Sequence, residues 1–369
     1  MRAMTPRIVP FFLSNADCPN QCVFCNRGIT AGASPAGITP EYFGAVLERS
    51  GGGEAAQVAF YGGDFTGLDA AEQERLLSLA GSAVASGKAG SIRISCRPDT
   101  LAPSLGLISR YPVRTIEIGA QSMSDEVLLR SKRGHTARDV RNALILVKEK
   151  GFESGIHIMA GLPGDTPEGF RRTADEIADM RPDMVRIHPA IVLAGTELAE
   201  MLRRGEYRPL GMEEAVECCR YALLRFEAGN ISVIRIGLQT TPEMERPGAI
   251  IGGPFHPAFR SLVTGSVLLE MALELLEYIN GRADPDVEFV VSPADVSDFH
   301  GIRNCNLNYL RERHSDVRIS IRTDPEIRRG TLLLRAGEMR LAISRTEYLS
   351  MNRAKRSAGA PYSFFNVFI

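Results

Sequence analysis

The stretch Cys18-Pro19-Asn20-Gln21-Cys22-Val23-Phe24-Cys25 follows closely on the apolar run from Ile8 to Leu13. It places three thiols in one short loop at the end of an expected strand. Thiolates are the ligands of iron–sulfur clusters and of zinc. Gaps of three and then two residues let one loop direct all three sulfurs inward, and three ligands leave one iron of a four-iron cluster open. Structural zinc takes four ligands, usually from two pairs, and no second Cys-x-x-Cys pair follows. The spacing therefore favours an open iron–sulfur cluster, with zinc as the alternative.

The composition is that of an ordinary globular chain. The 369 residues are 44% hydrophobic and 24% charged, with a net charge of -1, which gives no overall signal for nucleic acid or membrane. No apolar run approaches the roughly 20 residues of a membrane span, and no signal-peptide core precedes the cysteines. Seven cysteines, an odd number with three of them in one loop near the N-terminus, do not indicate a disulfide framework. We therefore expect a cytoplasmic protein with no membrane contact.

Up to residue 195 the chain alternates between compact, largely apolar strands and helices. The expected strands are 8–13, 57–61, 91–95, 115–119, 154–159 and 184–189. This pattern predicts parallel βαβ units with right-handed crossovers, in an α/β fold of the partial (βα)6 barrel kind. The unusual residues of each unit follow its strand, at the end where parallel barrels place their chemistry. We expect these strand ends to converge on one mouth.

The last part of the chain has a different pattern. After helices at 197–204 and 212–228, a strand at 231–238 could extend the sheet, and a loop rich in Pro and Gly covers 241–257. A long helix is expected at 258–278. A small α+β segment follows, with strands at 287–291, 317–322, 331–335 and 338–345 and a helix at 294–313. We predict a core at 1–240, a loop and helical extension at 241–285, and a small C-terminal domain at 286–369.

Several motifs together resemble a known superfamily. Cys18-x3-Cys22-x2-Cys25, with Phe24 before the last cysteine, resembles the signature of radical S-adenosylmethionine (SAM) enzymes, and Gly62-Gly63-Asp64 resembles their glycine-rich second-strand motif. Four further stretches are most similar to the radical domain of the Elongator catalytic subunit, and less so to oxygen-independent coproporphyrinogen III oxidases. They are Cys96-Arg97-Pro98-Asp99, Glu117 to Ser122, Arg133-Gly134-His135-Thr136 and His188-Pro189 with Gly195-Thr196. The resemblance covers roughly residues 8 to 238.

The resemblance implies a cofactor pair and a chemistry. Cys18, Cys22 and Cys25 would hold a 4Fe-4S cluster whose open iron binds SAM. An electron from an external donor of the flavodoxin or ferredoxin type would cleave SAM, and the resulting 5′-deoxyadenosyl radical would take hydrogen from the substrate. The protein would position the reactants and exclude solvent. We therefore expect an enzyme, an oxidoreductase or a transferase.

Cofactor contacts are expected at three strand ends. Gly62 and Gly63, with Asp64 in the same motif, would let backbone carbonyls approach the SAM ammonium; an ordinary turn is the alternative. Gln121 and Ser122 would bond ribose hydroxyls, or else satisfy local backbone.

Three more side chains have two interpretations each. Arg133 would pair with the methionine carboxylate, or stand solvated at a helix entry. His157 replaces an Asp of the porphyrinogen oxidases, which favours a buried, hydrogen-bonded histidine over a ribose contact. Cys96 favours buried packing over a role beside the mouth.

The substrate is not defined by the motifs. Residues 239–369 lack the pyrophosphate-loop pattern of an acetyltransferase. Residues 301–369 hold 13 Lys and Arg against 6 Asp and Glu, which fits a phosphate-binding face or a solvated surface. RNA is one substrate hypothesis. The alternatives are a porphyrinogen-oxidase-like enzyme acting on a small molecule and a non-catalytic protein that binds a cluster or cofactor.

Overall fold

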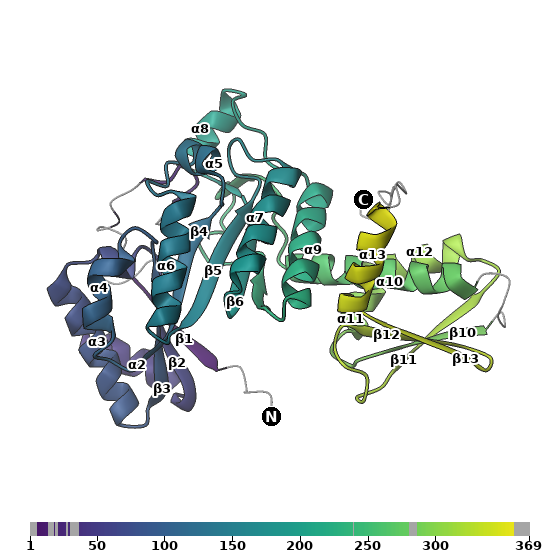
Figure 1. Cartoon of the computed structure of the whole chain (residues 1–369), viewed down its shortest axis with the longest axis horizontal. Helices are drawn as coiled ribbons and strands as arrows, with labels where there is room; N and C mark the ends of the chain where they lie inside the picture. Colours follow the sequence, from purple (N-terminus) through teal and green to yellow (C-terminus); the bar gives the residue numbers. More distant parts are fainter. Residues whose placement is uncertain are drawn as a thin grey trace.

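The computed structural model describes residues 6–13, 18, 21–26, 29, 37–238, 240–279 and 286–357, with side chains as far as Met351. Within these ranges no helix is long and apolar enough to cross a membrane. Two lobes are visible, the larger one built on a curled sheet and the smaller one on a second sheet (Figure 1).

The larger lobe is an open, all-parallel sheet of seven strands that confirms the predicted partial barrel. Its strands lie in the order β1 (Arg7–Phe12), β2 (Gly53–Tyr61), β3 (Ala89–Cys96), β4 (Val113–Gln121), β5 (Glu153–Ala160), β6 (Met184–Pro189) and β8 (Ser232–Ile236). Strands that follow one another along this sheet are also its neighbours in space, and the chain between them is largely helical. The strand expected at 231–238 does extend the sheet, as β8.

Helices connect these strands, and side-chain caps fix where several of them begin. The connecting helices are α2 (Pro40–Arg49), α3 (Ala70–Ala85), α4 (Leu101–Ile108), α5 (Asp125–Arg130), α6 (Ala137–Glu149), α7 (Pro167–Met180), α8 (Glu197–Arg203) and α9 (Met212–Ala228). The hydroxyls of Thr39, Thr136 and Thr166 accept backbone N–H bonds in the first turns of α2, α6 and α7. Such caps satisfy amide groups that the helix itself leaves unpaired.

The strands of the half-barrel alternate between two kinds of side chain. One set is apolar and almost fully buried in the core shared with the helices: Val58, Phe60, Ile92, Ile94, Ile116, Ile118, Ile156, Ile158, Val185 and Ile187. The positions between them are mostly polar or glycine, and we call the surface they form the concave face: Gln57, Tyr61, Arg93, Thr115, Glu117, Gly119, His157, Arg186, His188 and Arg235. The expected strands are largely apolar, and their polar residues gather on one face because successive residues of a strand point to opposite faces.

The smaller lobe is a mixed sheet with strand order β11 (Arg318–Thr323), β10 (Asp286–Val291), β12 (Thr331–Ala336) and β13 (Met339–Ser344). The helix expected at 294–313 is broken into α11 (Val296–His300), a 3-10 turn (Ile302–Asn304) and α12 (Cys305–Arg313), because Arg303 and Asn304 adopt left-handed backbone angles. A helix that the sequence did not predict, α13 (Arg345–Ser357), follows β13.

The long helix α10 (Phe259–Ile279) lies between the two lobes. It contacts α9 and β8 of the larger lobe, and α11, α12 and β12 of the smaller one. A short antiparallel pair, β7 (Val192–Leu193) and β9 (Ile250–Gly252), ties the segment before α10 to the rim of the half-barrel. Buried residues of both lobes belong to one continuous apolar core. The division at 240 and 285 remains a prediction.

Candidate functional site

The cysteine loop follows β1 and is held by the chain segments around it. Within it, the Cys25 amide donates to the Cys22 carbonyl at 3.0 Å. Val23 donates its amide to the Ser131 carbonyl (3.2 Å) and accepts from the Leu198 amide (2.8 Å). Its side chain is buried against β7 and α8. The backbone N–H and C=O groups of Val23 therefore anchor the loop to the segment after α5 and to α8.

A second anchor explains the Gly195-Thr196 motif. The side-chain amide of Asn26 donates to the Ala194 carbonyl at 2.5 Å. Gly195 has a φ of +69°, and a side chain there would approach the Asn26 amide to 3.3 Å, so glycine suits the position. Thr196 caps α8 by accepting from the Ala199 amide. This motif thus holds the end of the cysteine loop.

The three cysteines differ in exposure. Cys18 is half-buried, Cys22 is buried and Cys25 is exposed. Among the described residues, no three His, Cys, Asp or Glu side chains are gathered closely enough to hold a metal ion. Three thiols from one anchored loop are nevertheless the donor chemistry that a 4Fe-4S cluster requires, so the residues present fit this group.

Arg133 links the cysteine loop to the end of β4. Its Nη1 donates to the Cys22 sulfur at 3.1 Å, and its Nη2 donates to the Gly119 carbonyl at 2.7 Å. The side chain is buried, and its Nε has no partner among the described atoms. The alternative of a solvated arginine at a helix entry is wrong. A buried guanidinium with an unused donor beside a thiol is suited to receive a carboxylate.

Arg97, which sequence reasoning did not single out, lies next to Arg133. It is 3% exposed and donates to the Arg133 carbonyl and to the Asp99 carboxylate. Its Nε and Nη1 have no partner in the described structure. The Cys96-Arg97-Pro98-Asp99 stretch therefore places a second cation with unused donors at the mouth.

Gln121 ends β4 in an unusual conformation. Its φ is +68°, and the pairing of β4 with β5 shifts register between Gly119 and Gln121. Such a bulge re-aims a side chain at a strand end. The Gln121 Oε1 is buried without a partner among the described residues, and a side chain at Gly119 would meet the Gln121 amide at 3.3 Å and Arg133 Nη2 at 3.4 Å. Gln121 and Arg133 thus lie together over Gly119.

Asp64 and the glycines before it form the loop after β2. Gly62 has a φ of +107°. The buried Asp64 carboxylate accepts from the Arg97 amide (3.1 Å) and from the hydroxyls of Thr66 (2.8 Å) and Thr100 (2.7 Å). Asp64 therefore ties the loop after β2 to the loop after β3, and its oxygens are engaged within the protein.

Ser122 and Cys96 are engaged away from the mouth. The Ser122 hydroxyl accepts from the Ser124 amide at 3.1 Å and lies 3.5 Å from the Thr173 hydroxyl on α7, which matches the interpretation that it satisfies local groups. Cys96 is buried in the apolar core, and burial raises the pKa of its thiol well above the ordinary value. It packs as a small apolar residue, as favoured from the sequence.

A buried ionic network lies below the mouth on the concave face. Glu117 pairs with Arg93 (2.5 Å) and Arg186 (2.6 Å) and accepts from the Tyr61 hydroxyl (2.9 Å). Gly155 leaves the room for it, since a side chain there would meet Glu117 Cγ at 2.8 Å. Burial alone would raise the pKa of Glu117, but the charges of Arg186 and Arg93 outweigh it, so the pKa is lowered. Sequence reasoning missed this network, although the alternation of polar and apolar residues in the strands was a signal for it.

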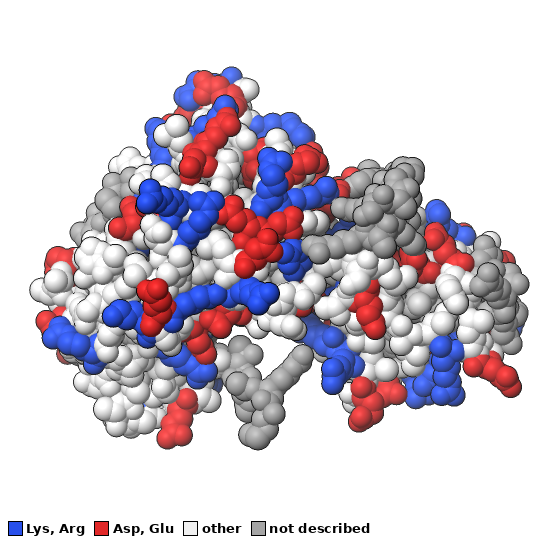
Figure 2. All heavy atoms as spheres, viewed as in Figure 1, with Lys and Arg blue, Asp and Glu red and all other residues white. Residues whose placement is uncertain are grey.

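Several arginines of the smaller lobe are paired with carboxylates. Arg318 pairs with Asp286, Arg335 with Glu288, and Arg329 with Asp295. Basic and acidic side chains are intermixed over the face shown in Figure 2, with no extended area of one sign. The excess of positive charge in this segment therefore gives only weak support for a phosphate-binding face.

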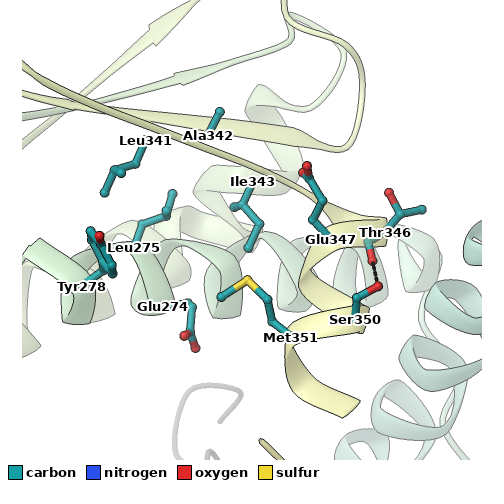
Figure 3. A pocket seen from close by; sticks show the side chains of 10 residues that line it. All are labelled: Glu274, Leu275, Tyr278, Leu341, Ala342, Ile343, Thr346, Glu347, Ser350 and Met351. Carbon is teal, nitrogen blue, oxygen red and sulfur yellow. Dashed lines mark hydrogen bonds between the residues drawn. The ribbon is translucent and has the colours of Figure 1, made fainter. Parts of the chain in front are cut away.

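The smaller lobe also contains a cavity of about 570 Å³ between α10, β13 and α13. Figure 3 shows mostly apolar side chains around it, including Leu275, Ile343 and Met351, with Glu274 and Glu347 among them. None of the residues of the mouth lines it. It is therefore separate from the candidate cofactor site.

Comparison with known proteins identifies the family. Residues 14–177 match the radical SAM superfamily, and residues 182–267 match the radical SAM C-terminal domain. These matches cover more than half of the chain. The chain belongs to the radical SAM superfamily. As the superfamily implies, its expected cofactors are a 4Fe-4S cluster and SAM.

Individual relatives agree with this placement. The tRNA uridine(34) acetyltransferase of Methanocaldococcus jannaschii is 36% identical over 160 residues, which is 42% of this chain and 29% of that protein. Human Elongator complex protein 3 is 31% identical over 133 residues, 34% of this chain and 24% of that protein. The chain thus matches less than a third of the length of either relative. The solved structure of Methanocaldococcus infernus Elp3 has a TM-score of 0.53 at 22% identity, covering 75% of this chain and 63% of that one, and supports the fold.

Proposed function

We propose that this radical SAM protein is an enzyme that binds a 4Fe-4S cluster through Cys18, Cys22 and Cys25 and cleaves SAM reductively. The observation that carries this proposal is the position of Arg133, buried between the Cys22 thiol and the end of β4. When bound, the cluster supplies the electron for cleavage, delivered by an external flavodoxin- or ferredoxin-type donor. SAM bound to the open iron would then lie next to Arg133, which contacts both the cysteine loop and the sheet.

The chain's own residues would orient SAM from three sides. Arg133 would receive the methionine carboxylate on its unused Nε, and Arg97 would add a second cationic donor. Gln121 would offer its unpartnered amide oxygen to a ribose hydroxyl. Backbone carbonyls at Gly62 and Gly63 would accept from the ammonium. We assign Asp64 and Ser122 to holding these loops in place, because their side chains are already engaged.

We propose RNA as the substrate class. The support is the identity of 36% over 160 residues and 38% over 133 residues to proteins named tRNA uridine(34) acetyltransferase. No acetyl transfer is proposed for this chain. A small-molecule substrate of the porphyrinogen type remains the competing hypothesis, with no described contact in its favour.

Anaerobic reconstitution with iron and sulfide tests the proposal. We expect about four iron atoms per chain and, after reduction with dithionite, formation of methionine and 5′-deoxyadenosine from SAM. The Cys22→Ala variant should lose both the iron and the cleavage.

The Cys305→Ala variant is the matched control, because Cys305 lies in the smaller lobe, and it should keep both properties. Full iron binding by Cys22→Ala would contradict the cluster assignment. An intact cluster that leaves SAM uncleaved would contradict the enzyme assignment.

A further inference from the structure

A row of paired residues crosses the concave face, starting at the candidate SAM site. In the register of the sheet, Gly119 pairs with His157, His157 with Arg186, and Arg186 with Arg235. Residues paired across neighbouring strands point to the same face. Since Gln121 and Arg133 lie over Gly119, the row leads from the SAM site across three further strands. A molecule lying along it would be next to the bound cofactor.

Two histidines in and beside this row have unused hydrogen-bonding groups. The rings of His157 and His188 are 4.3 Å apart between centroids, at an interplanar angle of 55°. His188 is 5% exposed, and neither of its ring nitrogens has a partner among the described atoms. The Nε2 atom of His157 also lacks one. Buried polar atoms usually find a partner in protein, ligand or ordered water, so these three nitrogens are available to a ligand on the concave face.

The two rings are uncharged at neutral pH. Burial and the charge of Arg186 lower the pKa of His157 to about 3, and burial followed by His157 lowers the pKa of His188 well below its ordinary value. A neutral imidazole carries one donor and one acceptor. The pair therefore offers donors and acceptors side by side and suits a planar group with an alternating edge, such as a nucleobase, better than it suits a carboxylate.

The surroundings of the rings are cationic. Three arginines lie near a single carboxylate, that of Glu117, which forms ion pairs with Arg93 and Arg186 but not with Arg235. Arg235 is half-buried and forms no ion pair within the described part of the chain. Its charge reaches both histidine rings. An anionic group of the ligand would therefore be drawn to Arg235, at the end of the row away from the SAM site.

We propose that the concave face binds a single nucleotide of the substrate, with His157 and His188 pairing with the edge of its base and Arg235 binding its phosphate. This inference rests on the proposed RNA function and adds to it the residues that select the base. A phosphate of RNA satisfies the free guanidinium, and a base edge satisfies the three ring nitrogens. One nucleotide thus accounts for both features, which lie within one row of the sheet.

Binding of fluorescently labelled tRNA by the reconstituted protein tests the inference, with anisotropy as the readout. The probes are a tRNA transcript with uridine at position 34, the position in the relatives' names, and the same transcript with cytidine there. We expect the wild type to prefer the uridine form, and His188→Phe to reduce that preference about tenfold, since one good base contact discriminates by roughly this factor. The His300→Phe variant, a ring change in the smaller lobe, should leave the preference unchanged.

Arg235→Gln gives an independent second measurement, because Arg235 is half-buried and its replacement is not expected to prevent folding. It should weaken binding of both transcripts equally and lower the dependence of log affinity on log salt by about one. Arg340→Gln, a change of an exposed arginine on β13, is its control. Iron content and melting temperature of each variant show whether it is folded.

The outcomes separate the two levels of the proposal. A wild type that cleaves SAM but binds neither transcript shows that RNA is not the substrate. A wild type that binds both transcripts equally, or variants of His188 and Arg235 that behave like their controls, overturns the assignment of the concave face and leaves the RNA function standing.

Discussion

The convex and concave faces of the half-barrel are built from the same strands, residue by residue in alternation. On the convex face, Ile94 and Ile118 are 0% exposed and pack against helices. On the concave face, Arg93 and Glu117, one position away from each of them, form a buried ion pair. A period-two alternation thus lets a single strand contribute to the core and to the functional side. We therefore expect substitutions one residue apart in a strand to affect different properties, stability on the convex face and binding on the concave face.

The largest expected effect comes from Glu117, a residue of the concave face whose replacement should nevertheless affect stability. Glu117 is on the functional face, yet its replacement by Gln removes the charge that balances Arg93 and Arg186. Loss of one partner from a buried ion pair costs about 3–5 kcal/mol, so we expect a fall of that size in the free energy of unfolding, measured by urea titration.

Asp286→Asn, which breaks the exposed pair with Arg318, is the control and should change stability little, because exposed ion pairs contribute little. Equal, small losses in the two variants would show that the Glu117 network does not stabilise the sheet.

A slightly smaller effect separates the two faces directly. Ile118→Ala removes a fully buried side chain from the convex face and should lower the free energy of unfolding by about 3 kcal/mol, with SAM binding retained. Gln121→Asn shortens a concave side chain and keeps a residue that tolerates a positive φ. It should keep the stability and weaken SAM binding, as measured by equilibrium dialysis. The reverse pattern would contradict the assignment of the faces.

The smallest effect is a dependence of stability on pH. The folded pKa of His157, about 3, lies below its unfolded value of 6.5, so folding favours the neutral ring. Stability is then full above pH 6.5 and is lost as the pH falls towards 3, at no more than about 1.4 kcal/mol per pH unit for one ring. Urea titrations between pH 6.5 and 5 should show a shallower slope for His157→Phe than for the wild type and for His300→Phe. An unchanged slope would show that His157 is already charged or exposed.

Much of the half-barrel was predictable because its signals are local. Thr39, Thr136 and Thr166 cap the helices that they precede, and each expected strand of the half-barrel overlaps an observed strand. The break between α11 and α12 begins at Gly301, whose φ of +73° ends α11 and was a local signal that the prediction overlooked, and continues through left-handed angles at Arg303 and Asn304, which neither residue type requires. α13 was missed because most of its residues are polar.

The site was predictable only where residue type alone decides the chemistry. The three cysteines follow from their spacing, but the burial of Arg133 and Arg97 depends on chain segments that are distant in sequence. Arg133 meets Cys22 across 111 positions, and no local pattern encodes that contact. The polar side chains of the concave face could have been found from their alternation, whereas their partners depend on the register of the sheet.

The position of α10 has a consequence for how the molecule melts. Most of this helix is buried, and its sides are shared by the larger lobe, through α9 and β8, and by the smaller lobe, through α11, α12 and β12. Unfolding of either lobe would expose to water the apolar side of α10 that this lobe covers, and would thereby destabilise the helix on which the other lobe packs. We therefore expect the two lobes to lose their structure in one cooperative calorimetric transition, so that a stability change introduced in the smaller lobe shifts the melting of the half-barrel by the same amount.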